Sequence, residues 1–183
     1  MDDLSRKYYS DLRSADADVR YEAFRYLMKE TQEQVDWAAD MWDDLLALAS
    51  GGNNHERAIA TQLLINLAKS DPGKRILKDF DRIMLVTKDE KFVTARHTLQ
   101  SLWKIGIIGR EYQDLVIERL TTRYKEASAD KNATLIRYDI IENFRKIFDQ
   151  FRDASVKEKA LELIALEQEP KYQAKYHGLW KRS

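Results

Sequence analysis

The chain has 183 residues, and its 31 basic and 31 acidic residues balance to a net charge of zero at pH 7. Hydrophobic residues make up 44% of it, enough to build a core, and it contains no cysteine. This composition excludes disulfides, cysteine nucleophiles and thiolate metal sites. It also lacks the basic excess that nucleic-acid-binding domains usually carry.

The first residues, MDDLSRKYYSDL, are acidic and polar and contain no signal-peptide core. No apolar run approaches the roughly 20 residues that a membrane-spanning helix needs. We therefore expect a soluble cytoplasmic protein with no membrane attachment.

Apolar residues recur at helical spacing along nearly the whole chain, which has only two prolines and six glycines. Short polar breaks separate these periodic segments. The pattern predicts helices over 2–13, 16–31, 34–50, 53–70, 73–87, 90–105, 110–127, 131–149 and 154–167. No segment alternates as a strand would. A short aromatic and basic tail follows, in which we expect Trp180 to fold back and cover the end of the helical array.

Residue types that start helices stand at several of the breaks. Asp71 precedes a proline, a pair typical of an N-cap and first turn. Asn53 with Glu56, and Ser155 with Glu158, have the spacing of a capping box, in which two side chains each satisfy an unpaired backbone amide. We expect helices to begin at these three places.

One nonamer occurs nearly twice, as VRYEAFRYL from Val19 and as IRYDIIENF from Ile136. Its arginine has counterparts in two further segments, and these four marker arginines are Arg20, Arg57, Arg96 and Arg137. The residues three and seven positions after each marker are all apolar: Ala23, Ala60, Leu99 and Ile140, then Leu27, Leu64, Trp103 and Phe144. The recurrence predicts one domain over 1–183, built from helix pairs at 2–31, 34–70, 73–105 and 110–149 with a terminal cap at 154–183.

A polar loop followed by V/I-R-x-x-A/I-x-x-x-L/F, at a period near 40 residues, resembles the HEAT and armadillo-like repeat families. The resemblance covers residues 16–167. It implies an all-α fold, a right-handed α-solenoid of about four to five HEAT-like helix pairs that stack around one core. In those families the arginine-bearing helices line the concave side, which here would be formed by 16–31, 53–70, 90–105 and 131–149. The resemblance also implies a non-enzymatic scaffold that binds a protein or peptide on this side.

The marker arginines have two interpretations. In the structural one, each guanidinium bonds a carbonyl or carboxylate of the neighbouring repeat. In the functional one, the arginines form a row of anion-binding forks. We favour the structural interpretation, because a position that recurs in every repeat is the position a structural role requires. The basic residues predicted to contact a partner on the concave face are Arg57, Arg96, His97, Lys104 and Arg137.

Nucleic-acid binding is the alternative hypothesis. One branch of HEAT-like proteins comprises alkylpurine DNA glycosylases, which carry a basic groove with tryptophans and an aspartate, and Trp103 and Asp139 lie on neighbouring predicted inner helices. The positions two and five after the markers mix acids with bases, which opposes the phosphate neutralisation that drives such binding. A subunit of a larger enzyme, with a lyase or regulatory role, is a third hypothesis.

The remaining motifs point to no chemistry. None of His55, His97 and His177 has a second ligand at metal-site spacing. Neither a G-x-G-x-x-G motif, nor a P-loop, nor G-x-S-x-G occurs. We therefore expect no metal, no cofactor and no catalytic residue.

Overall fold

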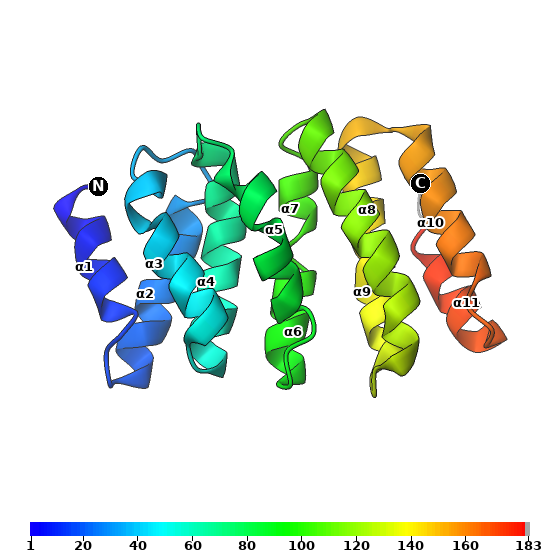
Figure 1. The fold of residues 1–183 in the computed structure, drawn as a ribbon, viewed down its shortest axis with the longest axis horizontal. Coiled ribbons are helices and arrows are strands. Elements are labelled where there is room, and N and C mark those ends of the chain that lie inside the picture. Colours follow the sequence, from blue (N-terminus) through cyan, green and yellow to red (C-terminus); the bar gives the residue numbers. More distant parts are fainter. Residues whose placement is uncertain (182–183) are drawn as a thin grey trace. The chain divides into compact units, whose positions relative to one another are not determined.

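A computed structural model describes residues 1–181 of the chain. In this range the chain forms eleven α-helices, two short 3-10 helices and no strand, which confirms the predicted all-α fold (Figure 1). The chain divides within α6 into two compact units, an N-terminal unit of Met1–Thr94 and a C-terminal unit of Ala95–Ser183. The solenoid and the single domain over 1–183 stay predictions.

The N-terminal unit contains five complete helices. They are α1 (Asp3–Asp11), α2 (Ala17–Glu30), α3 (Ala38–Gly51), α4 (Asn54–Leu67) and α5 (Arg75–Val86), with the 3-10 helix η1 (Ala68–Ser70) after α4. In sequence order α1 packs on α2 and α3 on α4, while α4 also contacts α2, and α5 contacts both α3 and α4 (Figure 1). Trp42, Leu64 and Phe80 are fully buried in the core that these contacts enclose.

The C-terminal unit contains most of α6 and all later helices. They are α6 (Phe92–Leu99), α7 (Trp103–Gly106), α8 (Arg110–Glu126), the 3-10 helix η2 (Ala127–Ala129), α9 (Ala133–Phe151), α10 (Ala154–Ala165) and α11 (Pro170–Gly178). The central element is α9, which packs against α7, α8, α10 and α11. Phe144 of α9 is fully buried, as are Tyr124 and Tyr176.

The helix starts predicted from capping residues are confirmed in part. The capping box at Asn53 is present, since Asn53 Oδ1 accepts from the Glu56 N–H at 3.1 Å and Glu56 Oε2 accepts from the Asn53 N–H at 2.7 Å. The box predicted at Ser155 is wrong. The chain turns at the left-handed residue Arg152, so Asp153 reaches the extended N-cap position first and accepts from the Ser155 N–H at 2.9 Å.

Other helices also begin later than predicted. The predicted helix 34–50 begins at Ala38, because the chain before it forms turns in which the Val35 N–H donates to Ser70 Oγ at 3.0 Å. The helix predicted from residue 73 begins at Arg75, although Asp71 still accepts from the N–H groups of Gly73 and Arg75. In the tail, α11 is a helix that the apolar pattern does not predict, because of its residues only Tyr176 is buried.

The predicted helix 90–105 is interrupted between α6 and α7 by the side chain of Asn143 from α9. In an unbroken α-helix the Trp103 N–H would donate to the Leu99 carbonyl. Instead Asn143 Oδ1 accepts from the Trp103 N–H at 2.6 Å, and Asn143 Nδ2 donates to the Leu99 carbonyl at 2.9 Å. A side chain inserted between two ladder partners breaks the helix at that point.

The break changes which residue enters the core. Of the eight apolar positions three and seven after the markers, seven are at most 1% exposed, as the repeat predicts. The exception is Trp103, which is half-buried, while Leu102 is fully buried in its place. The third copy of the repeat is therefore out of register by one residue after the break.

Candidate functional site

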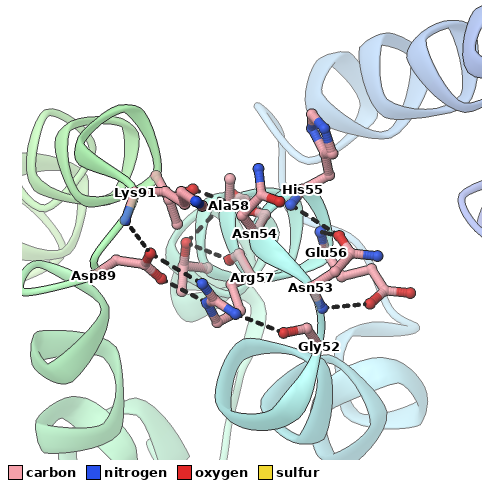
Figure 2. Close-up of polar contacts among 11 residues, drawn as sticks. Gly52, Asn53, Asn54, His55, Glu56, Arg57, Ala58, Asp89 and Lys91 are labelled. Carbon is pink, nitrogen blue, oxygen red and sulfur yellow. Dashed lines mark hydrogen bonds and ion pairs between the residues drawn. The ribbon is translucent and has the colours of Figure 1, made fainter.

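The marker arginine Arg57 lies at the start of α4, where it joins two segments of the N-terminal unit (Figure 2). Its Nε and Nη2 donate to the two carboxylate oxygens of Asp89 at 2.5 and 3.0 Å, and its Nη1 donates to the Gly52 carbonyl at 2.7 Å. Burial works to raise the pKa of Asp89, but the hydrogen bonds from Arg57 and from the Lys91 N–H outweigh it and lower that pKa. The His55 ring points away from this pair (Figure 2).

In the C-terminal unit, Arg96 makes the corresponding pair across two helices. Its Nε and Nη2 donate to the two oxygens of Asp139 on α9 at 2.7 and 2.8 Å, and Gln100 Nε2 adds a third hydrogen bond at 3.1 Å. Asp139 is 1% exposed, so this carboxylate is desolvated and its charge is offset by the Arg96 fork. Asp139, which the hypothesis of nucleic-acid binding likens to the glycosylase aspartate, therefore holds α6 against α9.

The other two markers are held in a similar way. Arg137 on α9 donates to Glu167 Oε2 at 2.9 Å and to the Tyr124 carbonyl at 3.4 Å, with its guanidinium 5.1 Å from the centre of the Tyr124 ring. Arg20 donates to the carbonyls of Ser14 and Ala15 at 2.7 and 2.8 Å. Arg57, Arg96 and Arg137 thus each bond a carboxylate of the next predicted helix pair or of the cap, as the structural interpretation expects. Arg20 differs, because the carbonyls that it bonds lie within its own predicted helix pair, 2–31.

The five residues predicted to bind a partner are not all brought together. Arg57 belongs to the N-terminal unit and the other four to the C-terminal unit. Within the C-terminal unit, Arg96 and Arg137 are held by different carboxylates, His97 is exposed on α6, and Lys104 is half-buried on α7. Partner binding through these five residues stays a prediction.

A surface that sequence reasoning missed lies along α9, and we call it the α9 face. It consists of Trp103 from α7, Tyr138, Glu142 and Lys146 from α9, and Lys175 from α11. Lys146 Nζ lies 5.7 Å from the centre of the Trp103 ring and 3.0 Å from Glu142 Oε2. Lys175 Nζ lies 4.8 Å from the centre of the Tyr138 ring. Both aromatic rings are half-buried, and each has an ammonium group nearby.

A second feature that sequence reasoning missed is the Phe148 cluster, which consists of Phe148, Trp180, Arg145, Arg152 and Lys157. The Phe148 and Trp180 rings lie 5.4 Å apart. The cations of Arg145, Arg152 and Lys157 lie 5.9, 5.4 and 6.0 Å from the centre of the Phe148 ring. A spacing of three residues on α9 could have revealed Arg145, whereas Arg152 follows the last residue of that helix. Nothing local in the sequence points to Lys157.

The two units differ in charge although the whole chain is neutral. The N-terminal unit has 14 basic and 18 acidic residues, and the C-terminal unit has 17 basic and 13 acidic residues. Both surfaces described above therefore belong to the unit with the positive surplus.

In comparisons with protein-family models, curated proteins and solved structures, the chain has no significant match. Among residues 1–181, no three histidine, aspartate or glutamate side chains form a group that could hold a metal ion. Over the same range, no helix combines the length and the apolar character that crossing a bilayer requires.

Proposed function

We propose that this chain is a non-enzymatic interaction module of the cytoplasm that binds an acidic segment of a partner protein on the α9 face. The observation that carries the proposal is the composition of that face. Trp103 and Tyr138 offer large amphipathic rings of the kind that dominate binding energy at protein interfaces. Lys146 and Lys175 lie over those rings, and Glu142 is the single carboxylate among them.

The proposed architecture is a HEAT-like right-handed solenoid with α9 on its inner wall. Two observations support it. Within each unit, several consecutive helices pack as neighbours, such as α3 with α4 and α9 with α10, and helices two apart also contact, as α2 does with α4 and α7 with α9. In addition, marker arginines 39 to 41 residues apart, at 57, 96 and 137, each pair with a carboxylate 30 to 43 residues further along the chain.

The face can be tested with a displayed random-peptide library selected against the purified chain. We expect the selected peptides to be rich in aspartate and glutamate. The variants Tyr138→Ala and Lys175→Glu should each lower their affinity by roughly tenfold or more, the size of a hot-spot loss. Lys159→Glu on α10 makes the same charge change outside the face and should leave affinity within about twofold. Selected peptides that bind wild type and both face variants equally would contradict the proposal.

Nucleic-acid binding is a second candidate, and the observation that favours it is the positive surplus of the C-terminal unit. Phosphate contacts release counterions, so binding through this surplus would weaken steeply as salt is added. The α9 face argues against this function, because Glu142 lies beside Lys146 and its negative charge repels phosphate groups.

A further inference from the structure

The Phe148 cluster concentrates positive charge beyond what its own carboxylate balances. Within residues 1–181, three cations surround one ring and form ion pairs with one carboxylate, Asp149, which lies 2.8 Å from Arg145 and 3.6 Å from Arg152. The next carboxylate along the chain, Asp153, is engaged by Arg110 of α8 at 2.6 Å. The cluster with Asp149 therefore has a net charge of about +2.

The cluster is also incomplete in its hydrogen bonding. The indole N–H of Trp180 is buried and has no acceptor among residues 1–181. Buried donors are normally paired with a protein group, a water or an ion. Arg145 is held in place, because its Nε donates to Asp149 and its Nη1 donates to the Leu179 carbonyl. The side chain of Arg152 is 66% exposed, and Lys157 is exposed on α10.

The backbone of Arg152 adds an independent observation. This residue ends α9 with a left-handed φ of 53°, a position at which helices usually place glycine. A side chain at positive φ costs free energy, and such strain tends to be kept where it serves a function. Here it positions the Arg152 guanidinium back over the Phe148 ring, 5.4 Å from its centre.

We propose that the Phe148 cluster is a binding subsite for a phosphate group carried on a peptide. A phosphomonoester carries a charge of about −1.5 to −2 at pH 7, which matches the surplus of the cluster. The guanidinium fork of Arg152 and the ammonium of Lys157 supply donors for its oxygens. The side chain of Phe151, 46% exposed beside Arg152, offers apolar contact to residues flanking the phosphate, which favours a peptide over a free anion. The subsite uses none of the side chains of the α9 face.

Binding can be measured by fluorescence anisotropy with a short labelled peptide that carries one phosphoserine between leucines. We expect the phosphorylated peptide to bind at least tenfold more tightly than the same peptide without phosphate. Arg152→Gln and Lys157→Gln should each weaken its binding by about tenfold, the effect of losing one charge-assisted hydrogen bond. Asp149→Asn should strengthen binding severalfold, because it removes the competing carboxylate. Lys159→Gln, which removes a charge elsewhere on α10, should change affinity by less than about twofold.

Three results would overturn the proposal. The first is equal affinity for the phosphorylated and unphosphorylated peptides. The second is a loss in Lys159→Gln as large as the loss in Arg152→Gln, which would show unspecific charge attraction. The third is competition by inorganic phosphate, or by a single-stranded oligonucleotide, at the same concentration as the phosphopeptide. Thermal melts of each variant show whether it is folded, and Arg152 is exposed enough that Arg152→Gln should keep the fold.

Discussion

The side-chain oxygen of Asn143 accepts a hydrogen bond from the backbone N–H of Trp103 at 2.6 Å, and this contact decides the form of the third repeat. The same amide donates to the Leu99 carbonyl, so one side chain of α9 replaces the helical bond that would join the end of α6 to the start of α7. The break turns Trp103 out of the core and toward the α9 face. Asn143 thereby determines the position of the Trp103 ring, on which the proposed function depends.

Asn143→Ala should therefore destabilise the protein strongly. Asn143 is 1% exposed, and its removal leaves the Leu99 carbonyl and the Trp103 N–H without their partner. We expect the free energy of unfolding to fall by roughly 1–3 kcal/mol, the cost of unpaired buried polar groups. Urea denaturation measures this loss, and Gln150→Ala at an exposed position of α9 is the matched control. A midpoint equal to that of wild type would mean that α6 and α7 close into one helix at no cost.

Arg96→Lys tests whether the marker arginines are structural. Lysine keeps the charge but cannot offer the planar fork that holds both oxygens of Asp139. Because Asp139 is buried, the free energy of unfolding should fall by roughly 1–3 kcal/mol. Arg119→Lys on α8, whose partner Glu118 is exposed, should change stability by less than about 0.5 kcal/mol. Identical melting of Arg96→Lys and wild type would favour the functional interpretation of the markers instead.

The sequence predicts the local part of this fold well, for a physical reason. Positions such as Ala23, Leu64 and Ile140 are buried because helical periodicity alone places them on one face, and nearby residues suffice to show it. The insertion of Asn143 depends on a contact with residues about 40 positions earlier, and no periodic pattern encodes that. No apolar pattern predicts α11, because Tyr176 is the buried residue of this helix.

The candidate surfaces were harder to predict than the helices. The repeat pattern points to Arg57, Arg96 and Arg137, and in the structure each of these arginines pairs with a buried or half-buried carboxylate. The α9 face and the Phe148 cluster combine side chains from three helices or from two helices and the tail. Their members are ordinary surface residues in sequence, and only tertiary packing brings Trp180 onto Phe148.

Arg152→Gly should stabilise the protein while removing one cation of the Phe148 cluster. Glycine adopts the left-handed conformation of this residue without steric cost. We expect a gain of roughly 1 kcal/mol in the free energy of unfolding, the lower end of the range for such strain, measured by urea denaturation. Lys74→Gly is the matched control, since Lys74 has a φ of 50° at the start of α5 and lies outside the cluster. A loss of stability in Arg152→Gly alone would mean that the contacts of its guanidinium outweigh the strain.

Asp153 should make stability depend on pH in the acid range. Hydrogen bonds from the Ser155 hydroxyl, the Gln113 amide and the Ser155 N–H lower the pKa of Asp153 to about 2 in the folded protein. In the unfolded chain the pKa of an aspartate side chain is about 3.9. Because the pKa is lower in the folded state, the ionised Asp153 carboxylate stabilises the fold fully at pH values above 3.9. This stabilisation is lost as the pH falls through 3.9 towards 2. The difference in unfolding free energy between wild type and Asp153→Asn should therefore shrink from pH 5 to pH 2.

Ser155→Ala provides the control for this titration. It removes the hydroxyl that contributes most to the lowered pKa of Asp153, so the folded and unfolded values move closer together. The loss of stability between pH 5 and pH 2 should be smaller in Ser155→Ala than in wild type. Equal pH profiles for wild type, Asp153→Asn and Ser155→Ala would show that other carboxylates account for the acid dependence.

Binding to DNA separates the two candidate functions. The positive surplus of the C-terminal unit should attract duplex DNA only weakly at physiological salt, because Glu142 and Asp149 interrupt the cations on α9. We expect a Kd on the order of 10⁻⁵ M or weaker, in the range of unspecific binding, and a steep loss of affinity as salt increases. An electrophoretic or anisotropy titration over several salt concentrations measures both quantities. Sub-micromolar binding at physiological salt, reduced by Lys146→Gln and Lys175→Gln but not by Lys159→Gln, would make the α9 face a nucleic-acid surface. Peptide binding would then have to be sought elsewhere on the chain.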